Sequence, residues 1–316
     1  MKKVFGILAT ASLLVACGGS QPVEEPGLKD VLGDKFLVGT ALNVNQSSGR
    51  DTASLAIVKK HFNAIVAENC MKSEEIHPEK DKFNFEDADK LVQFGIDNGI
   101  TVTGHCLIWH SQCARWIWQD ENGKDVSPEV LKQNMKDHIT AIVQRYKGKI
   151  LGWDVVNEAI MEDGSYRNSM FYRILGEEFI PLAFQYAHEA DPNIELYYND
   201  YNMHEPGKRA TVVKLIKDLK ARGLRIDAVG MQGHVGMDHN IVEFENSIKA
   251  YAEAGVKVMI TELDMSALPN RRWSANISDI EEYRESMNPY KEALPDSVSQ
   301  KWNAKMMDFM NLFIKH

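Results

Sequence analysis

The sequence has little of what zinc sites, nucleic-acid binding and membrane spans require. Only 4 of the 316 residues are cysteine, and their spacing lacks the Cys-x-x-Cys pairs typical of a zinc site. The net charge is −9 and the isoelectric point is near 5.6. A polyanion such as DNA would therefore be repelled, whereas a neutral or weakly acidic ligand would not. The apolar run Val4–Ala16 is too short to span a membrane.

The first residues have the features of an export signal. Two lysines precede the apolar run, and the small residues that end a secretory signal follow it. The sequence Leu14-Val15-Ala16-Cys17 resembles the lipobox of bacterial lipoproteins, which implies that residues 1–17 form the signal and that Cys17 is lipidated. An ordinary cleaved signal with an incidental cysteine is the alternative. Residues 18–27 contain two prolines and predict a short tether. We expect an exported protein that is lipid-anchored to a bacterial membrane. The expected location is either the outer membrane on its periplasmic side or the cell surface.

The remaining cysteines, Cys70, Cys106 and Cys113, are an odd number in a chain predicted to be exported. At most one pair could close as a disulfide. We expect buried thiols that pack as small apolar side chains, with one disulfide as the alternative.

Seven segments with the pattern of a buried strand alternate with seven helical segments. The predicted strands are Phe36–Ala41, Asn63–Asn69, Ile100–His105, Leu151–Ala159, Ile194–Asp200, Ile226–Gln232 and Val256–Glu262. The predicted helices are Thr52–His61, Glu86–Asn98, Pro128–Tyr146, Ser169–Glu189, Pro206–Arg222, Val242–Ala254 and Ser297–Lys315. This alternation favours an α/β protein with a parallel sheet, and seven units are one short of a (β/α)8 TIM barrel. We therefore expect a single barrel domain over residues 28–316 that lacks its eighth βα unit.

Two of the predicted strands end in a glutamate. Glu158 follows an apolar run and stands next to Asn157, and Glu262 ends the seventh strand. In parallel α/β proteins the ligand binds at the carboxyl ends of the strands. A single carboxylate there is more often a helix cap, but two are the minimum that glycoside hydrolysis requires.

Three motifs around these glutamates closely resemble the active-site strands of family 10 glycoside hydrolases, the endo-β-1,4-xylanases. The motifs are Gly104–Gln112, Trp153–Glu158 and Ile260–Asp264, and the resemblance covers roughly Leu28–His316. It implies hydrolysis of internal β-1,4-xylosidic bonds of xylan with retention. Family members continue with an eighth strand and a closing helix, so the resemblance implies a C-terminally truncated barrel. A xylan-binding lipoprotein with weak or no activity is the alternative.

The resemblance also implies roles for individual side chains. Glu158 is the expected acid/base and Glu262 the expected nucleophile. Asn157 would bind the sugar 2-hydroxyl in the −1 subsite, Gln232 would contact the acid/base, and His234 with Asp264 would hydrogen-bond the nucleophile. The other expected substrate-binding residues are Glu68, Asn69, Lys72, His105, Trp109 and Gln112, with Tyr201 on the aglycone side.

The histidines and carboxylates in the motifs are also compatible with an alternative function, that of a metal-dependent hydrolase on the same barrel. Such enzymes usually carry a His-x-His pair on the first strand, and Phe36–Ala41 contains no histidine. We therefore expect no metal and no other cofactor. The expected ligands are xylan and xylo-oligosaccharides, bound by a monomer.

Overall fold

The computed structural model describes residues 25–268, 288–290 and 292–316. The predicted signal, Cys17 and most of the tether lie outside the described residues. No helix in these ranges is long and apolar enough to cross a membrane.

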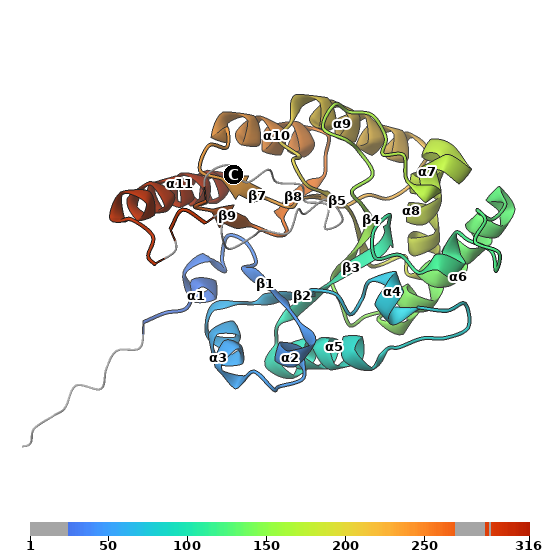
Figure 1. The fold of residues 1–316 in the computed structure, drawn as a ribbon, viewed down its shortest axis with the longest axis horizontal. Coiled ribbons are helices and arrows are strands. Elements are labelled where there is room, and N and C mark those ends of the chain that lie inside the picture. The colour runs from blue at the N-terminus through green and yellow to red at the C-terminus, as the bar shows by residue number, and fades with distance from the viewer. Residues whose placement is uncertain (1–24, 269–287, 291) are drawn as a thin grey trace, which may run out of the picture.

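A curled parallel sheet of seven strands forms the centre of the protein (Figure 1). The strands are β1 (Gly39–Leu42), β2 (Ala64–Ala67), β3 (Thr101–Trp109), β4 (Gly152–Asn157), β5 (Glu195–Asp200), β6 (Ala228–Met231) and β8 (Lys257–Ile260), and they neighbour one another in that order. This is the strand arrangement of a (β/α)8 TIM barrel, with seven strands among the described residues. The predicted fold class and all seven predicted strands are confirmed.

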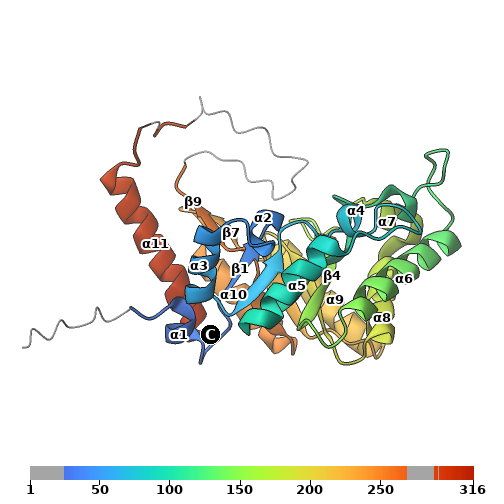
Figure 2. The same cartoon turned by 90° about the horizontal axis from the view of Figure 1, so that it is seen from below.

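Helices surround the outside of the sheet, and α11 lies at the opposite end of the molecule from α6 (Figures 1 and 2). The longer helices are α3 (Thr52–His61), α5 (Glu86–Asn98), α6 (Pro128–Arg145), α8 (Phe179–Ala190), α9 (Pro206–Ala221), α10 (Ile241–Glu253) and α11 (Asp296–Lys315). The shorter ones are α1 (Leu28–Leu32), α2 (Val44–Ser47), α4 (Ser73–Ile76), α7 (Met170–Leu175) and the 3₁₀ turns η1 (Arg115–Ile117) and η2 (Gly176–Glu178).

Local sequence signals explain where several helices begin and end. Ser127 accepts a hydrogen bond from the Val130 amide at 3.3 Å, and Pro128 occupies the first turn of α6. α5 ends at Gly99, whose φ of +62° is the left-handed conformation that glycine adopts without a steric penalty.

The long helix predicted over Ser169–Glu189 is wrong, because the structure divides it into α7, η2 and α8. The break is at Gly176, which has φ +60° and ψ −151°, a conformation that is essentially restricted to glycine. Apolar residues continue on both sides of Gly176, so the periodicity alone did not indicate the break.

The strands also differ from prediction at their ends. β3 continues to Trp109, four residues past its predicted end at His105, because Cys106, Leu107 and Ile108 are apolar and buried. β7 (His234–Gly236) and β9 (Asp264–Ser266), which pair in parallel, were not predicted. These short elements, together with α2, α4 and α7, follow the carboxyl ends of barrel strands and lie on one side of the molecule (Figure 2).

The core is built around the middle of the sheet. Every residue of β4 is buried, and Trp153 is fully buried. Cys70 and Cys106 are buried and Cys113 is partly buried, and all three are free thiols. Burial raises the pKa of Cys70 to about 11, so this thiol packs as a small apolar group, as expected.

Candidate active site

Glu158 immediately follows β4 and is almost completely buried, with 2% of its surface exposed. Both carboxyl oxygens accept a hydrogen bond, one from Trp109 Nε1 at 2.8 Å and the other from Gln232 Nε2 at 3.0 Å. Burial, followed by the negative charge of Asp200, raises the pKa of Glu158 to about 7. Glu158 therefore holds a proton over most of the acidic range.

Glu262 follows β8 in the opposite electrostatic environment. Burial would raise the pKa of Glu262, but the hydrogen bond from His234 and the charges of His105 and His234 outweigh it and lower the pKa to about 2. His234 lies 3.4 Å from Glu262 Oε2 and 3.0 Å from Asp264 Oδ2. These two carboxylates raise the pKa of His234 to about 10 against the effect of burial. Glu262 is therefore ionised beside a protonated histidine.

A chain of amides connects the two glutamates. Gln232 Nε2, which binds Glu158, is also 3.4 Å from Asn157 Oδ1. Asn199 Nδ2 donates to Asn157 Oδ1 and to Glu262 Oε1, both at 3.0 Å, and Thr261 Oγ1 donates to Asn199 Oδ1 at 2.7 Å. The structure thus brings four predicted residues together through Asn199, which the sequence analysis did not identify.

Asn69, Lys72 and Gln112 form a second polar group beside the glutamates. Lys72 Nζ donates to Asn69 Oδ1 and Gln112 Oε1, each at 2.8 Å, and lies 4.9 Å from the centre of the Trp109 ring. Burial lowers the pKa of Lys72, although Cys106, Glu262, Glu158 and Glu68 oppose this with their charges. Glu68 is itself exposed. An ammonium, two amides and an indole are suited to fixing the hydroxyls and the apolar face of a sugar.

His105 and Tyr201 each bind a residue that the sequence analysis missed. His105 Nδ1 is 2.8 Å from Asp154 Oδ2, and both side chains are buried. Tyr201 is buried, and its hydroxyl accepts a hydrogen bond from Arg167 at 2.5 Å. The aglycone-side role of Tyr201 stays a prediction.

The motifs alone contain no signal that predicts the contacts of Asp154 and Arg167. Asp154 faces His105 because the two are register partners in β3 and β4. Arg167 lies in the segment between β4 and α7, where its Nε donates to the Glu158 carbonyl at 2.9 Å. Across the described ranges, no group of three or more His, Cys, Asp or Glu residues is arranged to hold a metal ion.

The geometry therefore places a neutral carboxyl and an ionised carboxylate at the ends of two barrel strands, next to a group suited to sugar hydroxyls. Proton donation from one side and nucleophilic attack from the other are the two functions that these protonation states allow.

Comparison with known proteins points to one family. The family model described as glycosyl hydrolase family 10 matches residues 27–307. An endo-1,4-beta-xylanase A of Xylanibacter ruminicola is 51% identical over 295 residues, which are 92% of this chain and 80% of that protein. An endo-1,4-beta-xylanase A of Thermotoga maritima is 42% identical, over 93% of this chain but only 26% of that longer protein.

Solved structures agree with the sequence relatives. A GH10 endoxylanase retrieved from a sugarcane soil metagenome has a TM-score of 0.86 and 40% identity, with 92% of this chain and 85% of that chain covered. A psychrophilic family 10 endo-beta-1,4-xylanase has a TM-score of 0.83 and 39% identity, with 92% of this chain and 86% of that chain covered.

Proposed function

The chain belongs to glycosyl hydrolase family 10, and on this basis we propose that it is an endo-β-1,4-xylanase that hydrolyses internal bonds of xylan and xylo-oligosaccharides with retention. The observation that carries the proposal is the opposite protonation of two linked glutamates, with a pKa of about 7 for Glu158 and about 2 for Glu262. Retaining hydrolysis uses one carboxyl as acid/base and the other as nucleophile.

In the proposed first step, the ionised Glu262 attacks the anomeric carbon while Glu158 protonates the departing glycosidic oxygen. A covalent glycosyl-enzyme forms, and the reducing-end fragment of the chain leaves. In the second step, Glu158 takes a proton from water, which displaces Glu262 and restores both carboxyl groups. His234 keeps Glu262 ionised for the attack.

The amides would bind the sugar that reacts. Asn157 is fixed by Asn199 Nδ2 at its side-chain oxygen, so its NH2 group is the end that remains for the sugar 2-hydroxyl. A hydrogen bond there strengthens as the ring takes on oxocarbenium character. Lys72 and Asn69 would hold the −2 and −1 sugars. Gln112 would bind hydroxyls of the −1 sugar, and Trp109 would pack against its apolar face.

The proposal is tested with Glu158→Ala and two substrates. An aryl xylobioside with a poor leaving group needs protonation, so its kcat/KM should fall about 10²- to 10⁴-fold, whereas an activated dinitrophenyl xylobioside should lose far less. In the wild type, kcat/KM should decline as the pH rises above about 7, because Glu158 loses its proton there. An equal loss on both substrates would contradict the role of Glu158.

The role of Glu262 is tested by labelling and product analysis. A fluorinated xylobioside that turns over slowly should label Glu262, and the first product formed should have the β configuration. Release of α-configured product would rule out retention. Retention of the protein on insoluble xylan without turnover of soluble xylan would favour a binding protein instead.

We also propose that the protein acts as an exported monomer that is lipid-anchored at Cys17. The support is the signal-like sequence of residues 1–17. Cys17→Ser should move the protein from the membrane fraction to the soluble fraction, because the lipid would be lost and no helix of the described residues could cross the membrane in its place. Unchanged partition between the two fractions would contradict the anchor.

A further inference from the structure

The backbone that carries Glu158 is held in a conformation that is unusual for its sequence. Glu158 has φ +55°, in the left-handed region where a residue with a Cβ is strained. Such strain persists only where the surroundings hold it. Three successive amides in this segment donate to β5, as Glu158 N binds Asn199 O at 2.9 Å, Ala159 N binds Tyr198 Oη at 3.1 Å and Ile160 N binds Asp200 Oδ2 at 3.3 Å.

Asp200 is the centre of this attachment. It is fully buried, and Tyr198 Oη donates to its Oδ2 at 2.5 Å. Its other oxygen accepts from Lys208 Nζ and from the Tyr201 amide, both at 2.9 Å. Four donors, including the Ile160 amide, therefore converge on one carboxyl group. Burial raises the pKa of Asp200, while Lys208 and Tyr198 act to lower it. The four donors favour the ionised form, because a protonated carboxyl group would have to use one oxygen as a donor.

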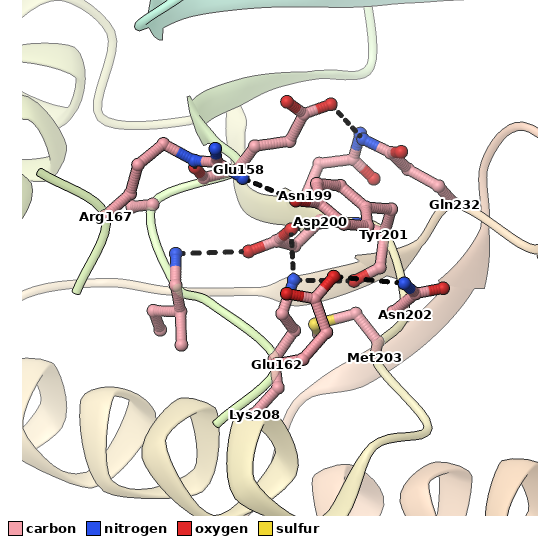
Figure 3. A network of polar contacts seen from close by, with 12 residues as sticks. Glu158, Glu162, Arg167, Asn199, Asp200, Tyr201, Asn202, Met203, Lys208 and Gln232 are labelled. Atoms are coloured by element: carbon pink, nitrogen blue, oxygen red, sulfur yellow. Dashed lines mark hydrogen bonds and ion pairs between the residues drawn. The ribbon is translucent and has the colours of Figure 1, made fainter. Parts of the chain in front are cut away.

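Lys208 completes the network from the first turn of α9. Its side chain is fully buried, and its ammonium also donates to the Tyr201 carbonyl at 2.9 Å. Figure 3 shows the Lys208–Asp200 ion pair on one side of the Glu158 segment and Gln232 on the other. A buried ion pair is weak evidence for stability, because its desolvation often offsets its attraction. Because Asp200 also accepts a hydrogen bond from the amide of Ile160, two residues after Glu158, the ion pair is placed to hold this segment.

We propose that Tyr198, Asp200 and Lys208 are positioning residues for the acid/base. The ion pair fixes Asp200, which with Tyr198 holds the backbone of residues 158–160 so that the Glu158 carboxyl reaches Trp109 and Gln232. The inference rests on the proposed function of Glu158, and it adds that proton donation depends on groups that do not touch the substrate.

The charge of Asp200 has a second effect. After burial, it is the largest influence that raises the pKa of Glu158, so the same residue orients the acid and helps keep it protonated. The charged and titratable groups that face Glu158 are Lys72 from the loop after β2, Cys106 from β3, Arg167 from the segment after β4, Asp200 from β5 and Glu262 after β8.

The test compares Tyr198→Phe with Tyr146→Phe. Each change removes a buried tyrosine hydroxyl that donates to an aspartate, but Tyr146 donates to Asp89 in α5, with no hydrogen bond to the Glu158 segment. On phenyl β-xylobioside, which needs protonation, Tyr198→Phe should lower kcat/KM about tenfold. On dinitrophenyl β-xylobioside the loss should be less than about threefold. Tyr146→Phe should change both by less than about twofold.

Equal losses on the two substrates in Tyr198→Phe would overturn the proposal, because a general structural defect would not depend on the leaving group. Glu158→Ala in the same assay separates the two levels of inference. If Glu158→Ala shows no dependence on the leaving group, the proposed function fails. If Glu158→Ala shows it and Tyr198→Phe does not, only the positioning network fails.

Asp200→Asn tests the charge. Loss of the negative charge should lower the pKa of Glu158 and move the alkaline limb of the kcat/KM profile to lower pH. An unmoved limb in a folded variant would contradict the effect of the charge. Because Asp200→Asn leaves Lys208 without its ion-pair partner, the variant can fail to fold, in which case the Tyr198→Phe comparison decides the proposal.

Discussion

At the scale of single residues, the two glutamates differ through their surroundings alone. Glu158 is 2% exposed and receives hydrogen bonds from an indole and an amide, neither of which carries charge. The Glu262 side chain keeps 33% of its surface exposed and lies beside a protonated histidine. A carboxylic acid in the first environment retains its proton and one in the second loses it. Two identical side chains thereby acquire opposite chemical functions.

The raised pKa of Glu158 should appear in the stability of the protein. The folded protein retains a proton on Glu158 up to a pH of about 7, whereas the unfolded chain releases it near the ordinary value of 4.5. The free energy of unfolding therefore falls as the pH rises from about 4.5 to about 7. Glu158→Gln abolishes this titration and keeps the size of the side chain, so its stability relative to the wild type should rise between pH 4.5 and pH 8.

The expected gain is on the order of 3 kcal/mol, from the pKa difference at 1.36 kcal/mol per unit. Urea unfolding of both proteins at the two pH values measures it, and the wild type corrects for every other titrating group. A difference that does not depend on pH would show that Glu158 is already ionised at neutral pH.

At the scale of elements, the break between α7 and α8 depends on the backbone conformation of Gly176, and this dependence can be tested by mutation. Gly176→Ala should destabilise the protein by about 1–3 kcal/mol, because the φ and ψ of Gly176 are strained for any residue with a Cβ. No atom lies within 4 Å of the added Cβ, so the cost comes from the backbone and not from a clash. The neighbouring exposed residue supplies a control, since Glu177→Ala should change stability by less than about 0.5 kcal/mol. Urea unfolding in which the two variants are equally stable would contradict the strain.

The ends of most helices were more predictable from the sequence than the ends of strands. α3 and α5 begin and end at the predicted residues, because caps and apolar spacing are local signals. Strand ends depend on pairing with neighbours, which is not local, and β3 therefore continued to Trp109.

In the candidate site too, residues with local sequence signals were predicted, and residues whose contacts join distant segments were missed. The two glutamates and Asn157 were predicted because they lie at strand ends within recognisable motifs. Asn199 was missed, because its contact with Asn157 arises from the register of β4 against β5, in which the two are partners. Tyr198 was missed because its contact with the Ala159 amide joins two segments that are distant in the sequence. Lys208 was missed because its link to the acid/base passes through Asp200, and no spacing in the sequence indicates such a link.

At the scale of the whole molecule, burial decreases from the middle of the sheet to its ends. All six residues of β4 are buried, whereas β1 and β8 each expose their first residue and bury at most one. Among the described residues, β1 pairs only with β2 and β8 only with β6. The glutamates follow strands of both kinds, Glu158 after β4 and Glu262 after β8. Among the described residues, the acid/base therefore follows the most buried strand of the sheet and the nucleophile follows a strand that is paired on one side.

Amide hydrogen exchange should reveal this gradient. Opening an end strand breaks one set of inter-strand hydrogen bonds, but opening β4 breaks two and exposes the core. Peptides from β1 and β8 should therefore exchange faster than those from β4, by on the order of tenfold or more. The comparison of β6 with β8 controls for length, because each has four residues and only β6 is buried throughout and paired on both sides. Exchange of β8 as slow as that of β6 would contradict the gradient and show that β8 has a further partner.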